Sequence, residues 1–134
     1  MRRCALRLAA ALVAAMALPG AAAAADAVVT ADVNMRAGPS TDFPVVAVIP
    51  DNGAVSVHGC LDGYEWCDVS WHAARGWVSA GYLQYFYQDR YVPALEYGTI
   101  VGVPILAYSL DTYWHRHYRH RPWYGRRAYW NRYW

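Results

Sequence analysis

Two cysteines flank a turn in this chain, and their type and spacing raise three possibilities: a disulfide, a redox pair or a metal site. Cys60 and Cys67 stand seven positions apart in the stretch GCLDGYEWCDV, with an Asp-Gly turn signal between them. This spacing differs from the C-x-x-C pair of redox proteins, and two cysteines alone cannot complete a tetrahedral zinc site. His58 and His72 would bring the ligand count to four, but nothing in their spacing requires it. The pattern therefore favours a disulfide across a hairpin and no metal site.

A catalytic set of side chains is not evident. A cysteine nucleophile needs a free thiolate, which a disulfide removes. The elbow motif of serine hydrolases is absent around Ser56, Ser70 and Ser79. Asp62 and Glu65 flank the turn, where turn formation and solvation explain them. We therefore predict a protein that is not an enzyme and needs no cofactor.

The first residues, 1–25, have the three parts of a secretory signal peptide. Three arginines precede an unbroken apolar run over residues 8–18, and small alanines follow Pro19 and Gly20. The run is shorter than the ~20 residues that a membrane-spanning helix needs, which argues against the alternative of an uncleaved anchor. We expect cleavage after Ala25 and a periplasmic or secreted protein. Export would place Cys60 and Cys67 in an oxidising compartment, where a disulfide is the default.

Short strand-like stretches separated by turn signals fill residues 26–87. The stretches alternate apolar and polar residues or are short apolar runs, and they cover residues 28–36, 45–49, 54–60, 66–71, 76–78 and 84–87. One turn of 3₁₀ helix is expected near residues 80–83. This pattern predicts an all-β fold, a small barrel or sandwich of about five strands.

Four motifs within residues 26–87 occur together in the order of a known family. They are NMRAGPS at 34–40, DGYEWCDV at 62–69, GWV at 76–78 and YL at 82–83. In these motifs the chain resembles the bacterial SH3 domain, the SH3b type of exported cell-envelope proteins. The resemblance implies an SH3-like barrel of about five strands without catalytic residues, in a family some of whose members bind peptidoglycan or its peptides. Binding of proline-rich peptides is not implied, because the ALYDY motif of eukaryotic SH3 domains is absent.

Tyr64, Trp66 and Trp71 are the candidates for a ligand groove on the barrel. Each lies near a predicted loop, and aromatic rings present flat apolar faces that suit sugars. Trp77 begins a predicted strand and is expected to pack in the core instead. Arg36 is expected to brace the first loop rather than to contact a ligand.

Residues 88–111 mix Gly, Pro and short apolar stretches, and we interpret them as an apolar linker or extra strands. Residues 99–108 could add a strand or a hairpin to the barrel, and a loose linker is the alternative. Ordered packing is favoured, because exposed runs of Ile and Val promote aggregation.

Charge divides the chain between an acidic body and a basic tail. Residues 26–111 carry ten acidic side chains and three arginines, a net charge of −7. Residues 112–134 carry six arginines, three histidines and no acidic side chain, a net charge of +6 with neutral histidines. No helical or alternating periodicity runs through this tail, so we predict that it is disordered on its own. Similar tails accompany this domain type in exported proteins of Gram-negative bacteria.

The tail combines two recognition chemistries. Arginine pairs with carboxylates and phosphates through two parallel hydrogen bonds, and Tyr and Trp suit sugar rings and lipid interfaces. The candidate binding residues of the tail are Arg116, Arg119, Arg121, Trp123, Arg126 and Arg127. The tail could instead fold back on its acidic body, finish the fold as aromatic strands, or bind a metal weakly through its histidines. Arginines among aromatics also suit single-stranded nucleic acid, but export argues against a nucleic-acid partner.

These features together predict a non-catalytic binding module in the periplasm, whose ligand is peptidoglycan or another envelope component. Binding would combine aromatic stacking in a barrel groove with electrostatic attachment through the tail, and an anionic lipid surface is a further partner to test. The alternative is a structural or protein-interaction module, whose basic tail docks on its own acidic body or on a partner protein.

Overall fold

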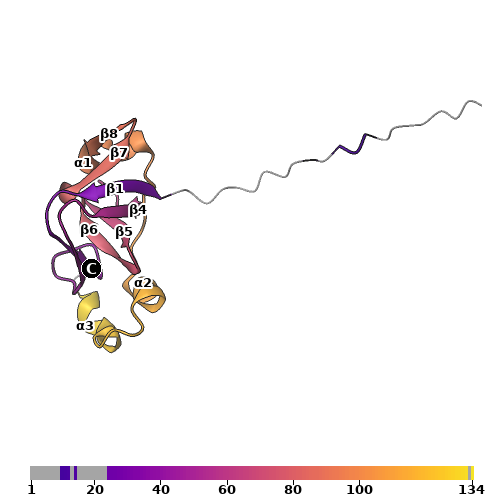
Figure 1. Ribbon diagram of the computed structural model, residues 1–134. Coiled ribbons are helices and arrows are strands. Elements are labelled where there is room, and N and C mark those ends of the chain that lie inside the picture. The colour runs from indigo at the N-terminus through magenta and orange to yellow at the C-terminus, as the bar shows by residue number, and fades with distance from the viewer. Residues whose placement is uncertain (1–9, 13, 15–23, 133) are drawn as a thin grey trace, which may run out of the picture.

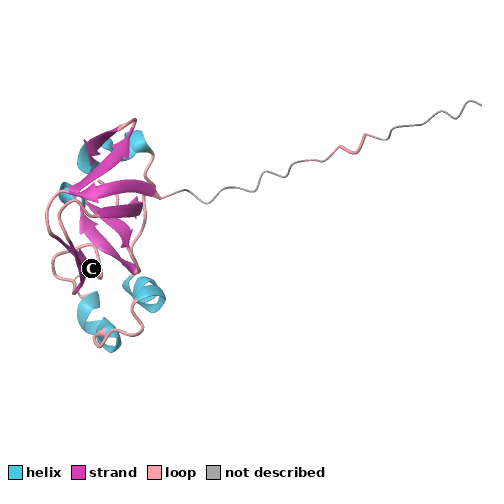
Figure 2. Cartoon of the chain, viewed as in Figure 1, coloured by secondary structure: helices cyan, strands magenta, loops and turns pink. Residues whose placement is uncertain are grey.

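A computed structural model describes residues 10–12, 14, 24–132 and 134. The signal peptide expected at residues 1–25 lies largely outside these described residues. Within the described part, no helix has both the length and the apolar character needed to cross a membrane. The described chain is a strongly curved sheet with α1 beside β7 and β8, and with α2 and α3 at the opposite end (Figures 1 and 2).

The strands of the described chain form one antiparallel sheet of eight. In space their order is β3-β2-β6-β5-β4-β1-β7-β8. Their bounds are Ala25–Val29 (β1), Val33–Arg36 (β2), Val45–Ile49 (β3), Ala54–Cys60 (β4), Trp66–Trp71 (β5), Ala74–Ser79 (β6), Leu83–Tyr87 (β7) and Arg90–Pro93 (β8). The expected 3₁₀ turn is η1, Ala80–Tyr82.

The all-β, SH3-like prediction is confirmed, but there are more strands than the five or so expected. The stretch predicted as one strand at 28–36 is two strands, β1 and β2, because the chain bends between them and Asp32 Oδ1 accepts a hydrogen bond from the Asp51 amide at 2.8 Å. Strand β8 pairs with β7 through a turn at Gln88 and Asp89, whose φ values are 49° and 62°. Glycine or asparagine usually fills such left-handed turn positions, so the sequence carries no strong mark of this hairpin.

The barrel core follows from the alternation along each strand. Met35, Ile49, Val57, Val69 and Val78 are each fully buried, and Leu83 is 2% exposed. A Cβ on Gly76 would lie 2.5 Å from Met35 Cγ and 2.7 Å from the Arg36 carbonyl oxygen. Glycine therefore lets β6 pack closely beside β2, its neighbour in the sheet.

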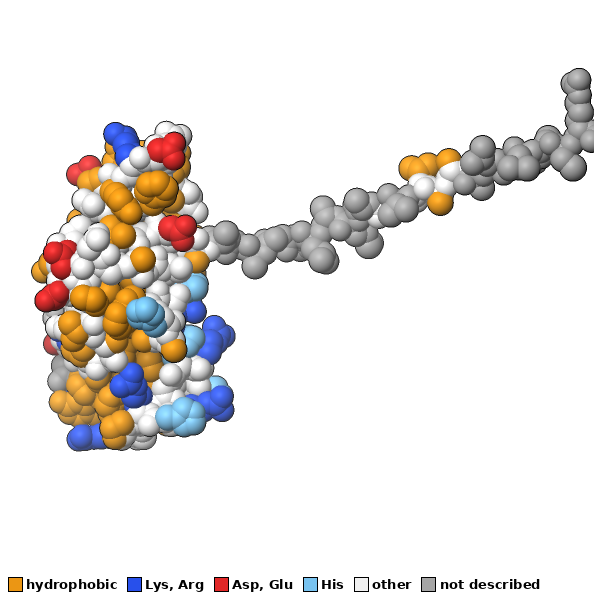
Figure 3. Space-filling model, viewed as in Figure 1, with side chains coloured by type: hydrophobic (Ala, Val, Ile, Leu, Met, Phe, Trp, Pro, Cys, Tyr) orange, Lys and Arg blue, Asp and Glu red, His pale blue; other side chains and the backbone are white. Residues whose placement is uncertain are grey.

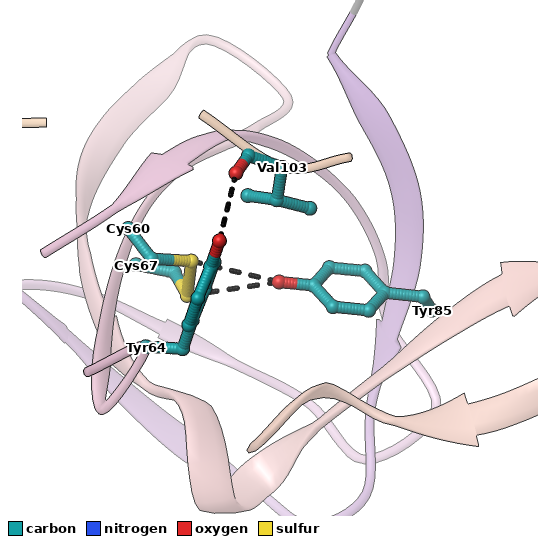
Figure 4. The surroundings of a disulfide bond; sticks show 5 residues. All are labelled: Cys60, Tyr64, Cys67, Tyr85 and Val103. Carbon is teal, nitrogen blue, oxygen red and sulfur yellow. Dashed lines mark hydrogen bonds between the residues drawn. A yellow bond between two sulfur atoms is a disulfide. The ribbon is translucent and has the colours of Figure 1, made fainter. Parts of the chain in front are cut away.

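The predicted disulfide is present between Cys60 and Cys67, which pair directly across β4 and β5. Gly63 has a φ of 86°, which marks the tight turn between the two strands. The hydroxyl of Tyr85 points at both sulfur atoms, 3.5 Å from Cys60 Sγ and 3.9 Å from Cys67 Sγ (Figure 4). Burial raises the pKa of Tyr85 to about 12, so the hydroxyl keeps its proton and can donate it to the sulfurs.

Residues 88–111 contain β8 and the helix α1, Ala94–Val101. Gly102 ends this helix with a φ of 82°. The apolar stretch 99–108 begins inside this helix, and beyond it makes one isolated bridge, between Ile105 and Cys60, rather than the strand or hairpin considered above. Two backbone hydrogen bonds support the bridge: the Cys60 amide donates to the Pro104 carbonyl at 2.9 Å, and the Leu106 amide donates to the Cys60 carbonyl at 2.7 Å.

The prediction that the tail is disordered is wrong. The tail forms α2 (Leu110–His117), the 3₁₀ turn η2 (Tyr124–Arg126) and α3 (Arg127–Asn131). Trp114 is 0% exposed and Tyr118 is 3% exposed, so these two aromatic side chains are buried against the barrel. Helices this short are marginal in isolation, and packing stabilises them rather than any periodicity of their own. The absence of a long helical repeat therefore did not indicate disorder.

Candidate binding site between the barrel and the tail

Strands β5 and β6 turn one face toward the tail. Because side chains alternate along a strand, Asp68, Arg75 and Trp77 lie on the face opposite to Val69 and Val78. The two valines fill the barrel core, and both are 0% exposed. The outer face of this hairpin thus carries an acid, a base and an indole, and the tail packs on it.

Aromatic rings of the tail and of the segment that leads into it cover Trp77. Its ring centroid lies 5.5 Å from that of Tyr108 and 5.8 Å from that of Tyr113. Trp114 Nε1 donates a hydrogen bond to the Ala37 carbonyl at 2.9 Å, and the Tyr108 hydroxyl donates to the same oxygen at 2.9 Å. The tail therefore forms a second core with the outside of the barrel, and it holds the loop that follows β2.

Asp68 is the centre of a buried polar network. It is 4% exposed and accepts two hydrogen bonds from Arg75, from Nε at 2.7 Å and from Nη2 at 2.8 Å. The Tyr113 hydroxyl donates to Asp68 Oδ1 at 2.6 Å. The carboxylate beside Arg75 raises the pKa of that guanidinium, and burial raises the pKa of Tyr113. Helix α2 is thus tied to the barrel by the hydrogen bond from Tyr113 to a carboxylate that is also paired with Arg75.

A cavity of about 280 Å³ opens beside this network, between β4–β6 and α2. We call it the seam cavity. The strands contribute His58, Arg75 and Trp77 to its wall, and the helix contributes Tyr113, Arg116 and His117. The His58 ring is fixed by a contact of 2.8 Å between its Nε2 and the Ser70 hydroxyl.

Both histidines of the seam cavity are neutral at neutral pH. Burial lowers the pKa of His58 and of His117, and the charge of Arg75 lowers each further. The exposed guanidinium of Arg116 is then the cation at the rim, because Arg75 is paired with Asp68.

The structure separates the six tail candidates into two groups. Arg116, Arg119 and Arg127 surround one shallow hollow of about 510 Å³, which we call the arginine face. Arg127 also lies over the Tyr124 ring at 4.7 Å and 3.9 Å from Asp111 in an exposed ion pair. In the view of Figure 3, arginine and histidine side chains gather mostly at the tail end of the molecule.

The other tail candidates make contacts within the protein. Arg121 Nη2 donates to the Val46 carbonyl at 3.0 Å and so ties the tail to β3. The Trp123 ring lies 4.6 Å from that of Trp114. Arg126 lies 5.6 Å above the Tyr129 ring. Arg121 and Trp123 therefore hold the tail in place.

The three barrel candidates do not form one groove. Tyr64 packs against α1, where a Cβ on Gly98 would collide with its ring, and its hydroxyl is 3.4 Å from the Val103 carbonyl (Figure 4). Trp66 lines a separate groove of about 200 Å³. Trp71, five positions further along β5, lies on the opposite face of the strand and contacts His72, with 4.5 Å between ring centroids.

Arg36 has the bracing role predicted for it. Its Nη1 donates a hydrogen bond to the Phe43 carbonyl across the first loop at 3.0 Å. Among residues 24–132 and the other described positions, no group of three or more His, Cys, Asp and Glu side chains is placed to hold a metal ion.

Of the residues that line the seam cavity, sequence reasoning named only Arg116 as a candidate for ligand binding. The alternation of β5 and β6 could have placed Asp68, Arg75 and Trp77 on one face, which is an unusual set for a small barrel to expose. No signal in the sequence shows that Tyr113 and His117 cover that face, because their contacts span about forty positions along the chain.

Comparison with known proteins agrees with the architecture. Residues 31–84 match the family described as "Bacterial SH3 domain". A segment of 52 residues is 38% identical to part of "Putative N-acetylmuramoyl-L-alanine amidase YrvJ" of Bacillus subtilis (strain 168), and the match covers 39% of this chain. The same segment spans 10% of the length of that relative, and no solved structure matches the chain significantly. The tail and the helical wall of the seam cavity lie outside the matched residues. Residues 31–84 are a bacterial SH3 domain.

Proposed function

We propose that this chain is a non-catalytic module that binds peptidoglycan in the periplasm. The observation that carries the proposal is the match of its SH3 domain to a segment of a protein whose name is that of an amidase acting on N-acetylmuramoyl-L-alanine. N-acetylmuramoyl-L-alanine is a unit of the cell wall. A binding domain in the same chain as such an amidase would hold the enzyme on its substrate. The charge pattern at the N-terminus supports export.

The arginine face is the surface we assign to attachment. Peptidoglycan stem peptides carry carboxylates, and guanidinium groups bind carboxylates through paired hydrogen bonds. Arg116 and Arg119 are exposed and Arg127 is half-exposed, so all three can meet a large polymer without rearrangement. The sequence-based mechanism also used a barrel groove of three aromatics; because these are dispersed, Trp66 alone remains as a stacking contact beside its own groove.

Co-sedimentation of the mature protein with purified peptidoglycan sacculi tests the proposal. The variant combines Arg116→Gln, Arg119→Gln and Arg127→Gln, and Arg90→Gln on β8 is the matched control. We expect at least a ~10-fold loss of affinity in the triple variant and a decline of wild-type binding with ionic strength, because these charges are exposed. Deleting the tail is a poorer test, since it would expose the second core.

Two results would contradict the proposal. Wild-type protein that stays in the supernatant at low salt would exclude a cell-wall ligand. Binding to vesicles containing anionic lipid, without binding to sacculi, would assign the arginine face to a membrane surface instead.

A second candidate function has its own observation. The tail docks on the barrel through Trp114 and Tyr118 rather than through ion pairs, so part of its composition is explained by folding alone. The chain would then be a protein-interaction module whose arginine face binds an acidic partner protein. Sacculi stripped of protein would not bind it, which separates the two candidates.

A further inference from the structure

We infer that the seam cavity is a discrete binding site for a carboxylate, such as the C-terminus of a short peptide. The inference rests on the proposed function only for the biological source of that carboxylate. The site itself follows from the donors that line the cavity.

Two buried donors in the wall of the seam cavity have no partner within the described protein. They are Trp77 Nε1 and His117 Nε2, both inaccessible to solvent and without a hydrogen bond. Trp77 is 1% exposed as a residue, and both residues line the same cavity. Buried polar atoms in proteins are nearly always paired, so two unpaired atoms at one cavity point to a group that pairs with them.

The chemistry of these atoms selects an acceptor. An indole N–H can only donate, and a neutral histidine ring donates when its proton is on Nε2. Arg116 lines the same cavity and has no hydrogen bond or ion pair to the described residues. Because both nitrogens are covered, a ligand reaches them only when the side chains over them move aside. Its atom must then accept hydrogen bonds, and a negative charge on it would be favourable beside Arg116.

The charge balance of the site favours a single negative charge. Arg75 is neutralised by Asp68, which also accepts a hydrogen bond from Tyr113. The histidines are neutral, so Arg116 leaves one uncompensated positive charge. A carboxylate supplies one negative charge and two acceptor oxygens in the geometry that suits a guanidinium.

The remaining wall suits a small apolar group next to the carboxylate. Leu106 and Ala107 line the cavity, together with the small polar residues Ser109 and Thr112. The volume of about 280 Å³ is close to the lower end of small-molecule sites. A C-terminal residue with a small side chain fits this combination. Because helix α2 supplies one wall, the site exists only where this tail follows the barrel.

The test follows the Trp77 indole N–H resonance of the full mature chain in ¹H–¹⁵N spectra. The probes are acetyl-D-alanyl-D-alanine, its C-terminal amide as the matched neutral control, and sodium acetate as a small carboxylate without a peptide. We expect a saturable shift of the Trp77 resonance with the acid, and at least ~10-fold weaker binding of the amide, since hydrogen bonds to a charged group are the stronger ones.

Two variants locate the site and one serves as control. Arg116→Gln removes the cation, and His117→Phe removes the donor while keeping a ring against Tyr113, from which His117 lies 4.6 Å between centroids. Each should weaken binding of the acid at least ~10-fold. Arg90→Gln, on β8 away from the seam cavity, should bind as the wild type does. The dispersed indole resonances report in the same spectra that each variant is folded.

Equal shifts with acid and amide, or no saturable shift of Trp77 with either carboxylate, would overturn the inference. His117→Phe keeps the arginine face intact, so it also separates this inference from the proposed function. If His117→Phe and wild type both sediment with sacculi while neither binds the acid, the seam cavity is not a carboxylate site and the cell-wall proposal still holds.

Discussion

Replacing Trp114 by alanine tests whether the tail is part of the folded domain. Trp114 is 0% exposed, its Nε1 donates to the Ala37 carbonyl at 2.9 Å and lies 3.1 Å from the Tyr108 hydroxyl, and its ring packs on Trp123. Truncation of a buried Trp costs about 3–5 kcal/mol, and the lost hydrogen bonding adds about 1 kcal/mol. We therefore expect Trp114→Ala to lower the free energy of unfolding by about 4–6 kcal/mol.

A loss of this size is a large part of the roughly 5–15 kcal/mol by which domains are stable, so it is measurable by urea denaturation followed by far-UV circular dichroism. Arg119→Ala is the control: it removes an exposed side chain of the same tail and should change the free energy of unfolding by no more than about 0.5 kcal/mol. If Trp114→Ala changed the free energy of unfolding by less than about 1 kcal/mol, the second core would be refuted, because truncating a tightly packed Trp costs more than that.

Three further predictions concern the same domain. Tyr113→Phe removes one donor from buried Asp68 and should lower the free energy of unfolding by about 1–3 kcal/mol in urea denaturation; an unchanged midpoint would contradict the network. Burial holds the pKa of His58 and His117 below the ordinary 6.5, so the unfolded chain takes up protons first as the pH falls. Stability should therefore decline below about pH 6.5, and less steeply in His117→Gln, as thermal unfolding between pH 7 and pH 5 would show. Replacing both cysteines of the disulfide by serine should cost about 2–3 kcal/mol, and a midpoint equal to that of the wild type would contradict a stabilising role.

The barrel could be predicted from the sequence because its signals are local. The motif NMRAGPS, the turn at Gly63 and the glycine at position 76 each fix a backbone feature within a few residues, and the structure has all three. The pairing of Cys60 with Cys67 was predictable for the same reason, since the two cysteines flank one hairpin.

The tail could not be predicted because its order depends on distant contacts. Trp114 and Tyr118 are buried only because Ala37 and Arg75 lie where β2 and β6 place them, and both tail residues hydrogen-bond to backbone carbonyls there. Composition showed arginines and aromatics together but not which of them face inward. In the structure, Trp123 packs on Trp114 and Arg121 hydrogen-bonds to the Val46 carbonyl, whereas Arg116 and Arg119 are exposed and have no such contact with the described residues. Only part of the predicted set therefore remains as a candidate for binding.

Cell-wall attachment through the arginine face is tested by sedimentation with purified sacculi at low salt. We expect wild-type protein and Arg90→Gln to pellet with the sacculi, and the variant lacking the charges of Arg116, Arg119 and Arg127 to stay largely in the supernatant while remaining folded. Pelleting of the triple variant to the wild-type extent would show that the arginine face does not attach the protein to the cell wall.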